Sequence, residues 1–342
     1  MRATKMKKAI SISKLLPLAM MALTLLFATT VYGAAPGITG PTFNLTAQAA
    51  YISQPDGAAV YSWGYGCNGA PAGFAPTAIT APVCPAMQIP GPTLIVTENQ
   101  LVTVTLTNNL PTSAGNTSIL FPGFQLQAFT DGTPGLLTQE AANGQTVTYK
   151  FIASTPGTHS YYSGTQGDLQ IEMGLYGAII VLPANVPGNC KANMGNFAGM
   201  NGVAEAHWGE KDFRLSQSAY DHSKTCYDRE YLFQFSEIDP NIHSQAQAQV
   251  DANSGCAAGA LGCSLNVPTE PYHPAYFLIN GRSMPDDMDP NYAIAYPHQP
   301  STAILTCILE NRCSCASSGR AVGNIRSTST VIMCASWGAM GT

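Results

Sequence analysis

The chain has 342 residues, of which only 10% are charged, and it contains 32 glycines and 24 prolines. A typical soluble domain is about one quarter charged. Long stretches of helical periodicity are scarce here, which excludes coiled coils, helical bundles and disordered acidic chains. The composition instead predicts an all-β protein built from short strands and turns.

Residues 1–33 have the pattern of a secretory signal peptide. A basic stretch precedes an apolar run from Leu15 to Ala28, which is shorter than the roughly 20 residues of a membrane-spanning helix. We expect cleavage after Gly33 or one residue later, export to the periplasm or the extracellular space, and no membrane association of the mature chain. Removal of the leader leaves ten Lys and Arg against twenty Asp and Glu, and this acidic balance excludes nucleic acid as a partner.

An oxidising destination favours disulfides. Six cysteines precede the last 42 residues and could form three bridges, although the sequence does not fix their connectivity. They are Cys67 and Cys84, which bracket a Gly/Pro-rich loop, Cys190 and Cys226, which bracket a second loop, and Cys256 and Cys263, which lie close together. None of them has the paired spacing of a zinc site.

Short strands separated by Gly/Pro turns run from residue 90 to residue 182. The predicted strands are Thr93–Thr97, Leu101–Thr107, Thr146–Ala153 and Gly174–Leu182. This pattern is typical of a Greek-key sandwich or barrel. Further strands are expected at Glu230–Glu237 and Tyr276–Asn280, with a long insertion at residues 243–270 between them.

Six motifs in this region resemble, in order, the first cupredoxin domain of a multicopper oxidase. They are Pro90–Val96, Leu106–Pro111, Asp131–Gly135, Gly144–Phe151, Pro156–Thr158 and Met173–Val181. A later segment, Tyr276–Arg282, is similar to a strand of that family's second domain. The resemblance implies a cupredoxin fold and, in the family, copper-dependent oxidation coupled to reduction of dioxygen.

The predicted fold is therefore an all-β, Greek-key, cupredoxin-like sandwich with one complete domain and a partial second one. The predicted divisions are a signal peptide at 1–33, a first cupredoxin-like domain at 44–185, a linker at 186–225, a partial second cupredoxin-like domain at 226–300, and an aberrant tail at 301–342.

Copper sites are built from imidazole nitrogens, and the family supplies them in a His-x-His-Gly and a Tyr-His-Ser-His motif. The corresponding segments here are Leu120-Phe121-Pro122-Gly123 and Tyr161-Tyr162-Ser163-Gly164. Four copper-ligand positions are thus occupied by Leu120, Pro122, Tyr162 and Gly164. Copper is the family's cofactor, but we expect this chain to bind none, and no metal-ligating or catalytic residue is predicted.

Other candidate ligands are isolated in the sequence. The six histidines are His159, His207, His222, His243, His273 and His298, and none belongs to a His-x-His pair. His159 precedes Tyr162 by three positions, which places it on the opposite strand face. Met173, Met284 and Met288 could be axial copper ligands but are expected to pack in the core. The cluster Asp286-Asp287-Met288-Asp289 could hold calcium but is expected to be a solvated loop.

The last 42 residues differ from the rest of the chain. From Ser301 onward there is no Pro, Phe, Tyr, His, Asp or Lys, and four cysteines appear, Cys307, Cys313, Cys315 and Cys334. One interpretation is a secreted tail with disulfides. The other is that translation leaves the gene's reading frame after about Pro300.

Back-translation in the shifted frame supports the second interpretation. Codons following Met or Trp are forced, so that Cys334 becomes Val while Gly338 and Gly341 remain Gly. Residues 323–341 can then encode Trp-Gln-His-Pro-Phe-His-Glu-His-Gly-Asn-His-Val-Arg-Ile-Leu-Gly-Arg-Asp-Gly, which resembles the copper-ligand motif of the family's final domain. The sequence predicts a one-base insertion or deletion near codon 300.

Three functions follow from these observations. The chain could be a copper-binding oxidoreductase, a metal-free cupredoxin module with a structural or partner-binding role, or an inactive truncated gene product. Because the first-domain ligand positions lack imidazoles, we expect a member of the family that is not catalytic as written.

Overall fold

The computed structural model describes residues 35–75, 82–188, 218–225, 229–257, 259–303, 312–316 and 330–337. The predicted signal peptide and residues 189–217 of the predicted linker lie outside these ranges.

Two sheets form a sandwich. One has the strand order β3-β2-β6-β9 and the other the order β10-β11-β5-β1-β4. The strands of the first sheet are β2 (Thr42–Ser53), β3 (Ala59–Cys67), β6 (Leu101–Asn109) and β9 (Thr146–Ile152). Those of the second are β1 (Gly37–Thr39), β4 (Phe74–Ala75), β5 (Leu94–Thr97), β10 (Gly157–Tyr162) and β11 (Tyr176–Leu182). The chain changes sheet between β1 and β2, between β3 and β4, between β5 and β6 and between β9 and β10, and β2 pairs in parallel with β6. This topology is the predicted Greek-key, cupredoxin-like sandwich.

Two strands of the sandwich core, β6 and β9, show strict alternation of buried and more exposed residues. In β6 the buried side chains include Val102, Val104 and Leu106, while the residues between them are partly exposed. The aromatic rings of Phe121, Tyr149, Phe151 and Tyr161 fill the space between the sheets, with ring centroids of neighbouring pairs 4.7–6.1 Å apart.

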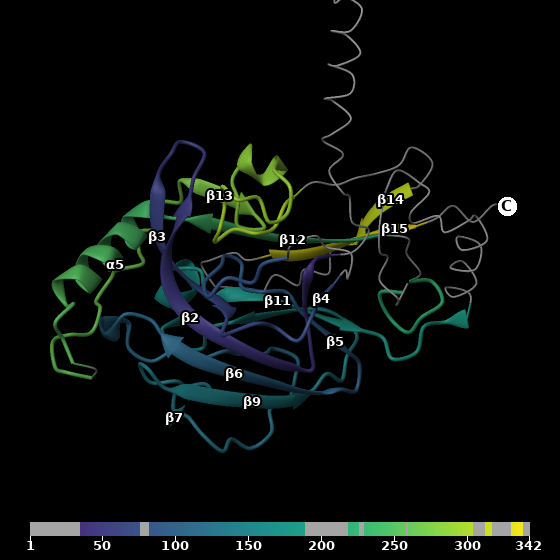
Figure 1. Cartoon of the computed structure of the whole chain (residues 1–342), viewed down its shortest axis with the longest axis horizontal. Helices are drawn as coiled ribbons and strands as arrows, with labels where there is room; N and C mark the ends of the chain where they lie inside the picture. Colours follow the sequence, from purple (N-terminus) through teal and green to yellow (C-terminus); the bar gives the residue numbers. More distant parts are fainter. Residues whose placement is uncertain are drawn as a thin grey trace, which may run out of the picture.

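A third sheet covers the outer face of β11. Its order is β13-β12-β15-β14, with β12 at Arg229–Ile238, β13 at Tyr276–Ile279, β14 at Arg312–Ala316 and β15 at Thr330–Trp337. Leu232 of β12 packs against Ile95, Ala178 and Ile180, while Ile179 of β11 faces the sandwich core. Both faces of β11 are therefore buried, which explains its continuous apolar sequence. Figure 1 shows the resulting three layers, with β12 and β15 above β11 and with β6 and β9 below it.

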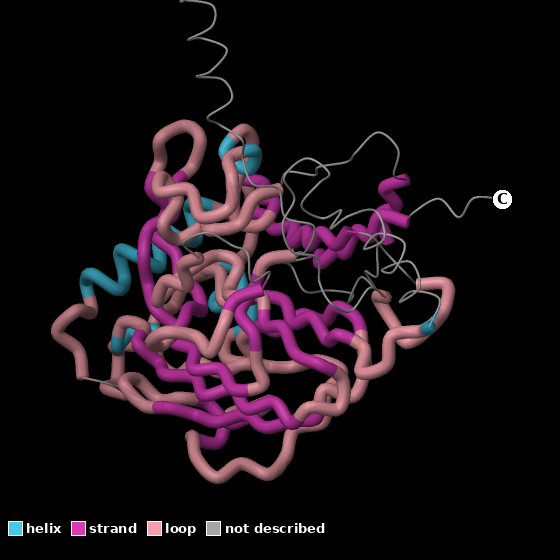
Figure 2. The backbone as a smooth tube through the Cα atoms, turned by 45° about the vertical axis from the view of Figure 1, so that its right-hand side comes forward, coloured by secondary structure: helices cyan, strands magenta, loops and turns pink. Residues whose placement is uncertain are grey.

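Residues 243–270, which the sequence suggested to be an insertion, begin within a helix. Helix α5 (Pro240–Ala252) starts at Asp239, whose carboxylate accepts a hydrogen bond from the Asn241 N–H at 2.9 Å. Ile242 and Ala246 pack in the same core cluster as the sandwich strands. The helix lies along one flank of the molecule beside β3 (Figure 2).

Five short elements complete the described structure. They are η2 (Thr112–Ala114), β7 (Thr133–Pro134), β8 (Gln139–Glu140), α2 (Gly167–Glu172) and η3 (Asp286–Met288). Among the residues that the structure describes, no helix has both the length and the apolar character needed to cross a bilayer.

Two disulfides link described residues. Cys67 at the end of β3 is bonded to Cys84, and Cys256 is bonded to Cys263. Cys190 and Cys226 lie outside the described residues, so their predicted pairing is left as a prediction.

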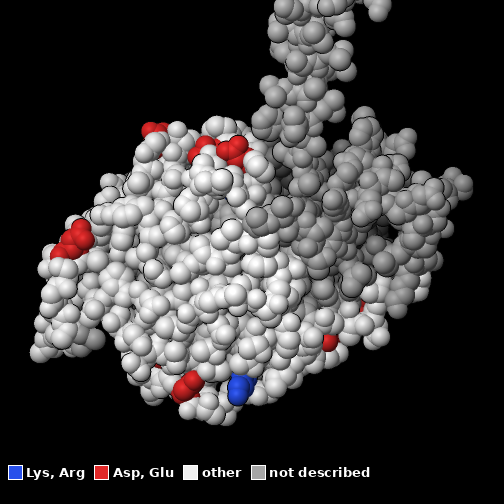
Figure 3. Space-filling model, in the orientation of Figure 1, with Lys and Arg blue, Asp and Glu red and all other residues white. Residues whose placement is uncertain are grey.

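The face of the molecule seen in Figure 3 carries scattered acidic groups and very few basic ones among its described residues.

Candidate functional site

The two segments that the sequence predicts to correspond to the family's copper-binding motifs are paired with each other. The Leu120 N–H donates to the Tyr162 carbonyl oxygen at 2.7 Å, and the Tyr162 N–H donates to the Leu120 carbonyl oxygen at 3.3 Å. A Cβ atom added to Gly164 would lie 2.8 Å from Cγ of Leu120. The structure thus brings together three of the four positions, Leu120, Tyr162 and Gly164.

A buried glutamine ties these two segments together. The Gln170 side chain, which is fully buried in α2, accepts hydrogen bonds from the Thr117 hydroxyl at 2.9 Å and the Ser163 hydroxyl at 2.7 Å. Its amide nitrogen donates to the Asn116 carbonyl oxygen at 2.8 Å. The Gly164 N–H in turn donates to the Ser118 hydroxyl at 3.1 Å. This polar network fixes the spacing of the two motifs.

The fourth position, Pro122, lies in an exposed turn. His159 packs beside that turn, because its ring centroid is 4.6 Å from that of Phe124 and Nε2 is 2.9 Å from the Thr155 carbonyl oxygen. Burial lowers the pKa of the His159 imidazole, and the Thr155 carbonyl opposes this effect. His159 therefore packs against an aromatic ring at a turn and is not a freely solvated side chain.

A cavity of about 580 Å³ lies beside the paired segments, and we call it the β10–α2 pocket. Leu120, Tyr162 and Gly164 line one wall. The other walls come from Leu137 of the β7–β8 turn, Ser163, Gly167, Asp168, Ile171 and Glu172 of the β10–α2 segment, Ile242 of α5, and Thr269, Glu270 and Tyr272. The pocket thus joins segments that are more than a hundred residues apart in the sequence.

Glu172 lines this pocket and is itself buried, with 4% of its surface exposed. Its carboxylate accepts hydrogen bonds from the Asp239 N–H at 2.8 Å and from the Tyr272 hydroxyl at 3.0 Å. Burial and the neighbouring Glu172 carboxylate raise the pKa of the Tyr272 phenol. Sequence reasoning missed both residues, and the only local signal was a carboxylate within the apolar run Leu169–Leu175.

His243 lies behind Glu172 and attaches α5 to the sandwich. Its Nδ1 is 2.6 Å from the Tyr61 carbonyl oxygen, and its Nε2 is 3.1 Å from the Glu172 carbonyl oxygen and 3.7 Å from the Glu172 carboxylate. The ring is 1% exposed. His243 is therefore a buried structural residue that contacts the pocket only through Glu172.

The other candidate ligands are dispersed. His222 and His273 are exposed, and Nδ1 of His298 lies 2.9 Å from the Met87 carbonyl oxygen, while His207 lies outside the described residues. Met173 is fully buried, as expected. Met284 and Met288, which were expected in the core, are instead 73% and 54% exposed.

The acidic cluster 286–289 surrounds a buried arginine. Arg282 is 0% exposed, and it donates from Nε to the Gln299 carbonyl oxygen at 2.7 Å and from Nη1 to the Asp289 carbonyl oxygen at 2.8 Å. Burial lowers the pKa of Arg282 to about 10 and raises that of Asp287, which is 2% exposed. The expectation that this cluster is solvated is thus wrong for Asp287, whose burial accompanies that of the guanidinium group.

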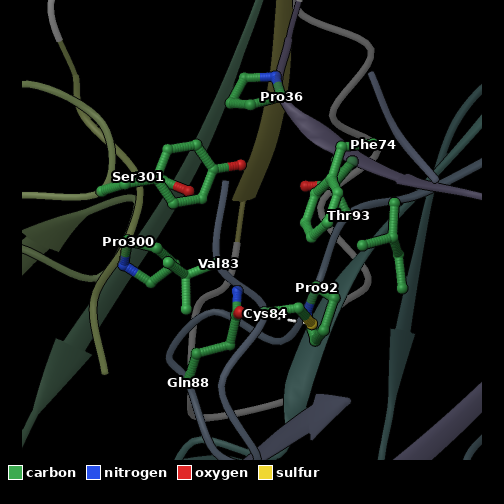
Figure 4. A pocket seen from close by; sticks show the side chains of 12 residues that line it. Pro36, Phe74, Val83, Cys84, Gln88, Pro92, Thr93, Pro300 and Ser301 are labelled. Carbon is green, nitrogen blue, oxygen red and sulfur yellow. Dashed lines mark hydrogen bonds between the residues drawn. The ribbon is translucent and has the colours of Figure 1, made fainter. Parts of the chain in front are cut away.

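A second, much smaller crevice lies where the start of β1 meets Pro300 and Ser301 (Figure 4). Its volume is about 20 Å³, which is enough for a water molecule and too small for an organic ligand. Phe74 and the disulfide-bonded Cys84 stand on its wall. We do not treat it as a functional site.

The residues of the β10–α2 pocket do not fit the family's copper chemistry. Imidazole nitrogens are the expected donors, whereas this wall offers a hydrocarbon, a phenol and a glycine. The space that a side chain at position 164 would need is occupied by Leu120. Across the described ranges, no three His, Cys, Asp or Glu residues gather in a group able to hold a metal ion. We therefore derive no reaction step through copper at this site.

Comparison with known proteins locates the similarity in the first sandwich. Residues 81–186 match the family model described as multicopper oxidase. Laccase 1 of Metarhizium acridum is 40% identical over 98 residues, which is 28% of this chain and 15% of that protein. Multicopper oxidase MCE of Talaromyces pinophilus is 36% identical over 103 residues, which is 29% of this chain and 16% of that protein. The aligned part is thus about one sixth of the length of these relatives.

Solved structures of similar proteins include the multicopper oxidase mgLAC, with a TM-score of 0.43 and 20% identity over 71% of this chain and 54% of that one. The blue copper oxidase from Nitrosomonas europaea has a TM-score of 0.39 and 18% identity over 72% of this chain and 54% of that one.

Proposed function

Because this chain belongs to the multicopper oxidase family through the domain at residues 81–186, we propose that it is an exported member whose first cupredoxin domain is a metal-free binding module. In this proposal the sandwich keeps the family's fold, while the end that holds copper elsewhere in the family forms a pocket for a small organic molecule. The activity of the full-length relatives is not carried over to this chain.

The packing of Leu120 against Gly164 carries the proposal. Cγ of Leu120 lies 2.8 Å from the Cβ position of Gly164, which supports the proposal that a hydrocarbon side chain takes the space that an imidazole would need there. Leucine and glycine have no donor atom for copper in their side chains, and the phenol of Tyr162 is a poor substitute for neutral imidazole.

Metal analysis and oxygen uptake test this function together. The protein is incubated with excess Cu(II), desalted and analysed for copper, and dioxygen consumption is then measured with a phenolic substrate. We expect no stoichiometric copper and no turnover. One tightly held copper per chain, or any turnover, would contradict the proposal.

Copper-dependent oxidation is the second candidate, and the C-terminal sequence favours it. If the reading frame is restored after about Pro300, the final-domain histidines return, although the first-domain positions still lack imidazoles. The nucleotide sequence around codon 300 tests the frameshift. Codons incompatible with the histidine-rich alternative would refute it.

Export is the remaining part of the proposal. The mature protein should begin at Ala34 or Ala35, and its intact mass after expression in a secreting host measures this directly. Retention of Met1 would show that the leader is not removed.

A further inference from the structure

We propose that the β10–α2 pocket binds a small organic cation, a molecule with a protonated amine and an apolar body. This inference rests on the proposed function, because it requires that copper does not occupy this end of the sandwich. It adds the chemical class of the ligand, for which the pocket wall supplies the evidence.

The size of the pocket suits such a molecule. Small-molecule sites typically have volumes of roughly 300–1,000 Å³, and the β10–α2 pocket measures about 580 Å³. Leu120, Ile171 and Ile242 supply apolar contact for the body of a ligand. A bare metal ion would make no contact with these apolar side chains.

The charge of the wall selects a cation. Among its described lining residues, the ionisable groups are the carboxyls of Asp168, Glu172 and Glu270 and the phenols of Tyr162 and Tyr272, with no Lys, Arg or His. An anion would be repelled by these carboxylates, and their field is stronger beside low-dielectric walls than in open water. Tyrosine rings also attract organic cations through their faces.

The carboxylates have different roles in this arrangement. Glu172 is buried and holds the Asp239 N–H and the Tyr272 hydroxyl, with His243 facing it at 3.7 Å from the α5 side. It therefore fixes the position of the Tyr272 phenol. Asp168 and Glu270 also line the pocket and are exposed, and the Asp168 carboxylate accepts a hydrogen bond from the Thr269 hydroxyl at 3.4 Å. In the proposal, the ammonium group of the ligand lies beside the carboxylates of these two residues.

The experiment is calorimetric titration of the full chain at low ionic strength and neutral pH. The three probes share one aromatic body, namely 2-phenylethylamine, 2-phenylethanol and 3-phenylpropanoate. We expect the amine to bind at least about tenfold more tightly than the alcohol, and the carboxylate not to bind.

Variants locate the site. Asp168→Asn with Glu270→Gln should weaken amine binding about tenfold, whereas Asp251→Asn, at an exposed position of α5 outside the pocket, should leave it unchanged. Gly167→Trp should block the pocket, because a Cβ at this position meets only Cδ1 of Ile171, at 3.7 Å. Circular dichroism checks that each variant is folded. If Gly167→Trp does not fold, the Asp168→Asn/Glu270→Gln variant alone tests whether the amine binds in this pocket.

Equal affinity for amine and alcohol, no amine binding by the folded protein, or an unchanged affinity in the Asp168/Glu270 variant would overturn the inference. Copper analysis of the same sample separates the two proposals. A copper-free protein that does not bind the amine refutes only the ligand class, whereas a stoichiometric copper refutes the proposed function itself.

Discussion

Two regions of the molecule, the sandwich core and the β10–α2 pocket, meet at β10, where Tyr161 packs in the core and the adjacent Tyr162 lines the pocket. Tyr161 is fully buried between the sheets, where its hydroxyl donates to the Pro92 carbonyl oxygen at 2.7 Å and its ring lies against Gly177. Tyr162 is half-buried on the opposite strand face and lines the β10–α2 pocket. The inward residue is part of the sandwich core, whereas the outward residue lies at one of the four positions that the motifs assign to copper ligands in the family. A substitution of the outward residue therefore leaves the packing between the two sheets in place.

The largest expected difference comes from truncating each tyrosine. Tyr161→Ala should lower the free energy of unfolding by about 3–5 kcal/mol, because it leaves a large cavity between the sheets. Tyr162→Ala should cost about 1 kcal/mol or less, as is typical outside the core. Urea denaturation measures both values. Tyr161→Phe, which removes only the hydrogen bond to Pro92, should lower the free energy of unfolding by about 1 kcal/mol. Equal losses of stability for the two alanine variants would contradict the distinction between a core tyrosine and a pocket tyrosine.

The Cys67–Cys84 disulfide provides a second test of the framework. Its loop spans 17 residues, so replacing both cysteines by alanine should cost about 3 kcal/mol through greater entropy of the unfolded chain. The thermal midpoint under non-reducing conditions measures the loss. Binding of 2-phenylethylamine by the folded variant should be unaffected, because neither cysteine lines the β10–α2 pocket.

A double-mutant cycle tests the packing of Leu120 against Gly164. Gly164→Ala places a methyl group 2.8 Å from Leu120 Cγ and should cost about 1–3 kcal/mol. In a Leu120→Ala background the same change should cost about 1 kcal/mol less, which gives a measurable coupling energy. Additive effects in urea denaturation would mean that Leu120 does not fill the space at position 164.

The smallest expected effect is a pH dependence at His159. Burial lowers its pKa in the folded state, so the unfolded chain binds more protons as the pH falls below the ordinary value of about 6.5. Folding stability should therefore decrease from pH 7.5 to pH 5. His159→Gln should flatten this slope, and an unchanged slope in the variant would show that other groups cause it.

Four strands of the sandwich, β5, β6, β9 and β11, could be predicted because their pattern is local, whereas β1, β2, β3, β4 and β10 were not predicted. The alternation in β6 and β9 and the apolar run of β11 are visible in the sequence, and so was the family resemblance that gave the topology. Helix α5 was missed because it is rich in Gln and Ala and buries only Ile242, His243 and Ala246, too few residues for an apolar stripe.

The sequence motifs predicted which four positions correspond to the family's copper ligands, but they did not predict the pocket. Glu172, Ile242 and Tyr272 are brought together only by the docking of α5 and of the segment around Tyr272 onto the sandwich. No spacing rule links residues that distant in the chain. The burial of Asp287 was missed for the same reason, because it depends on the chain folding around Arg282.

The double burial of β11 has a consequence for the order of events during synthesis. Every strand of the sandwich precedes residue 183, whereas Leu232, which covers Ile95, Ala178 and Ile180, lies beyond residue 228. At a synthesis rate of about 5–20 residues per second, the apolar outer face of the sandwich stays uncovered for several seconds until β12 has been synthesised. During this interval the nascent chain exposes an apolar surface to which a chaperone can bind, and the docking of β12 buries that surface.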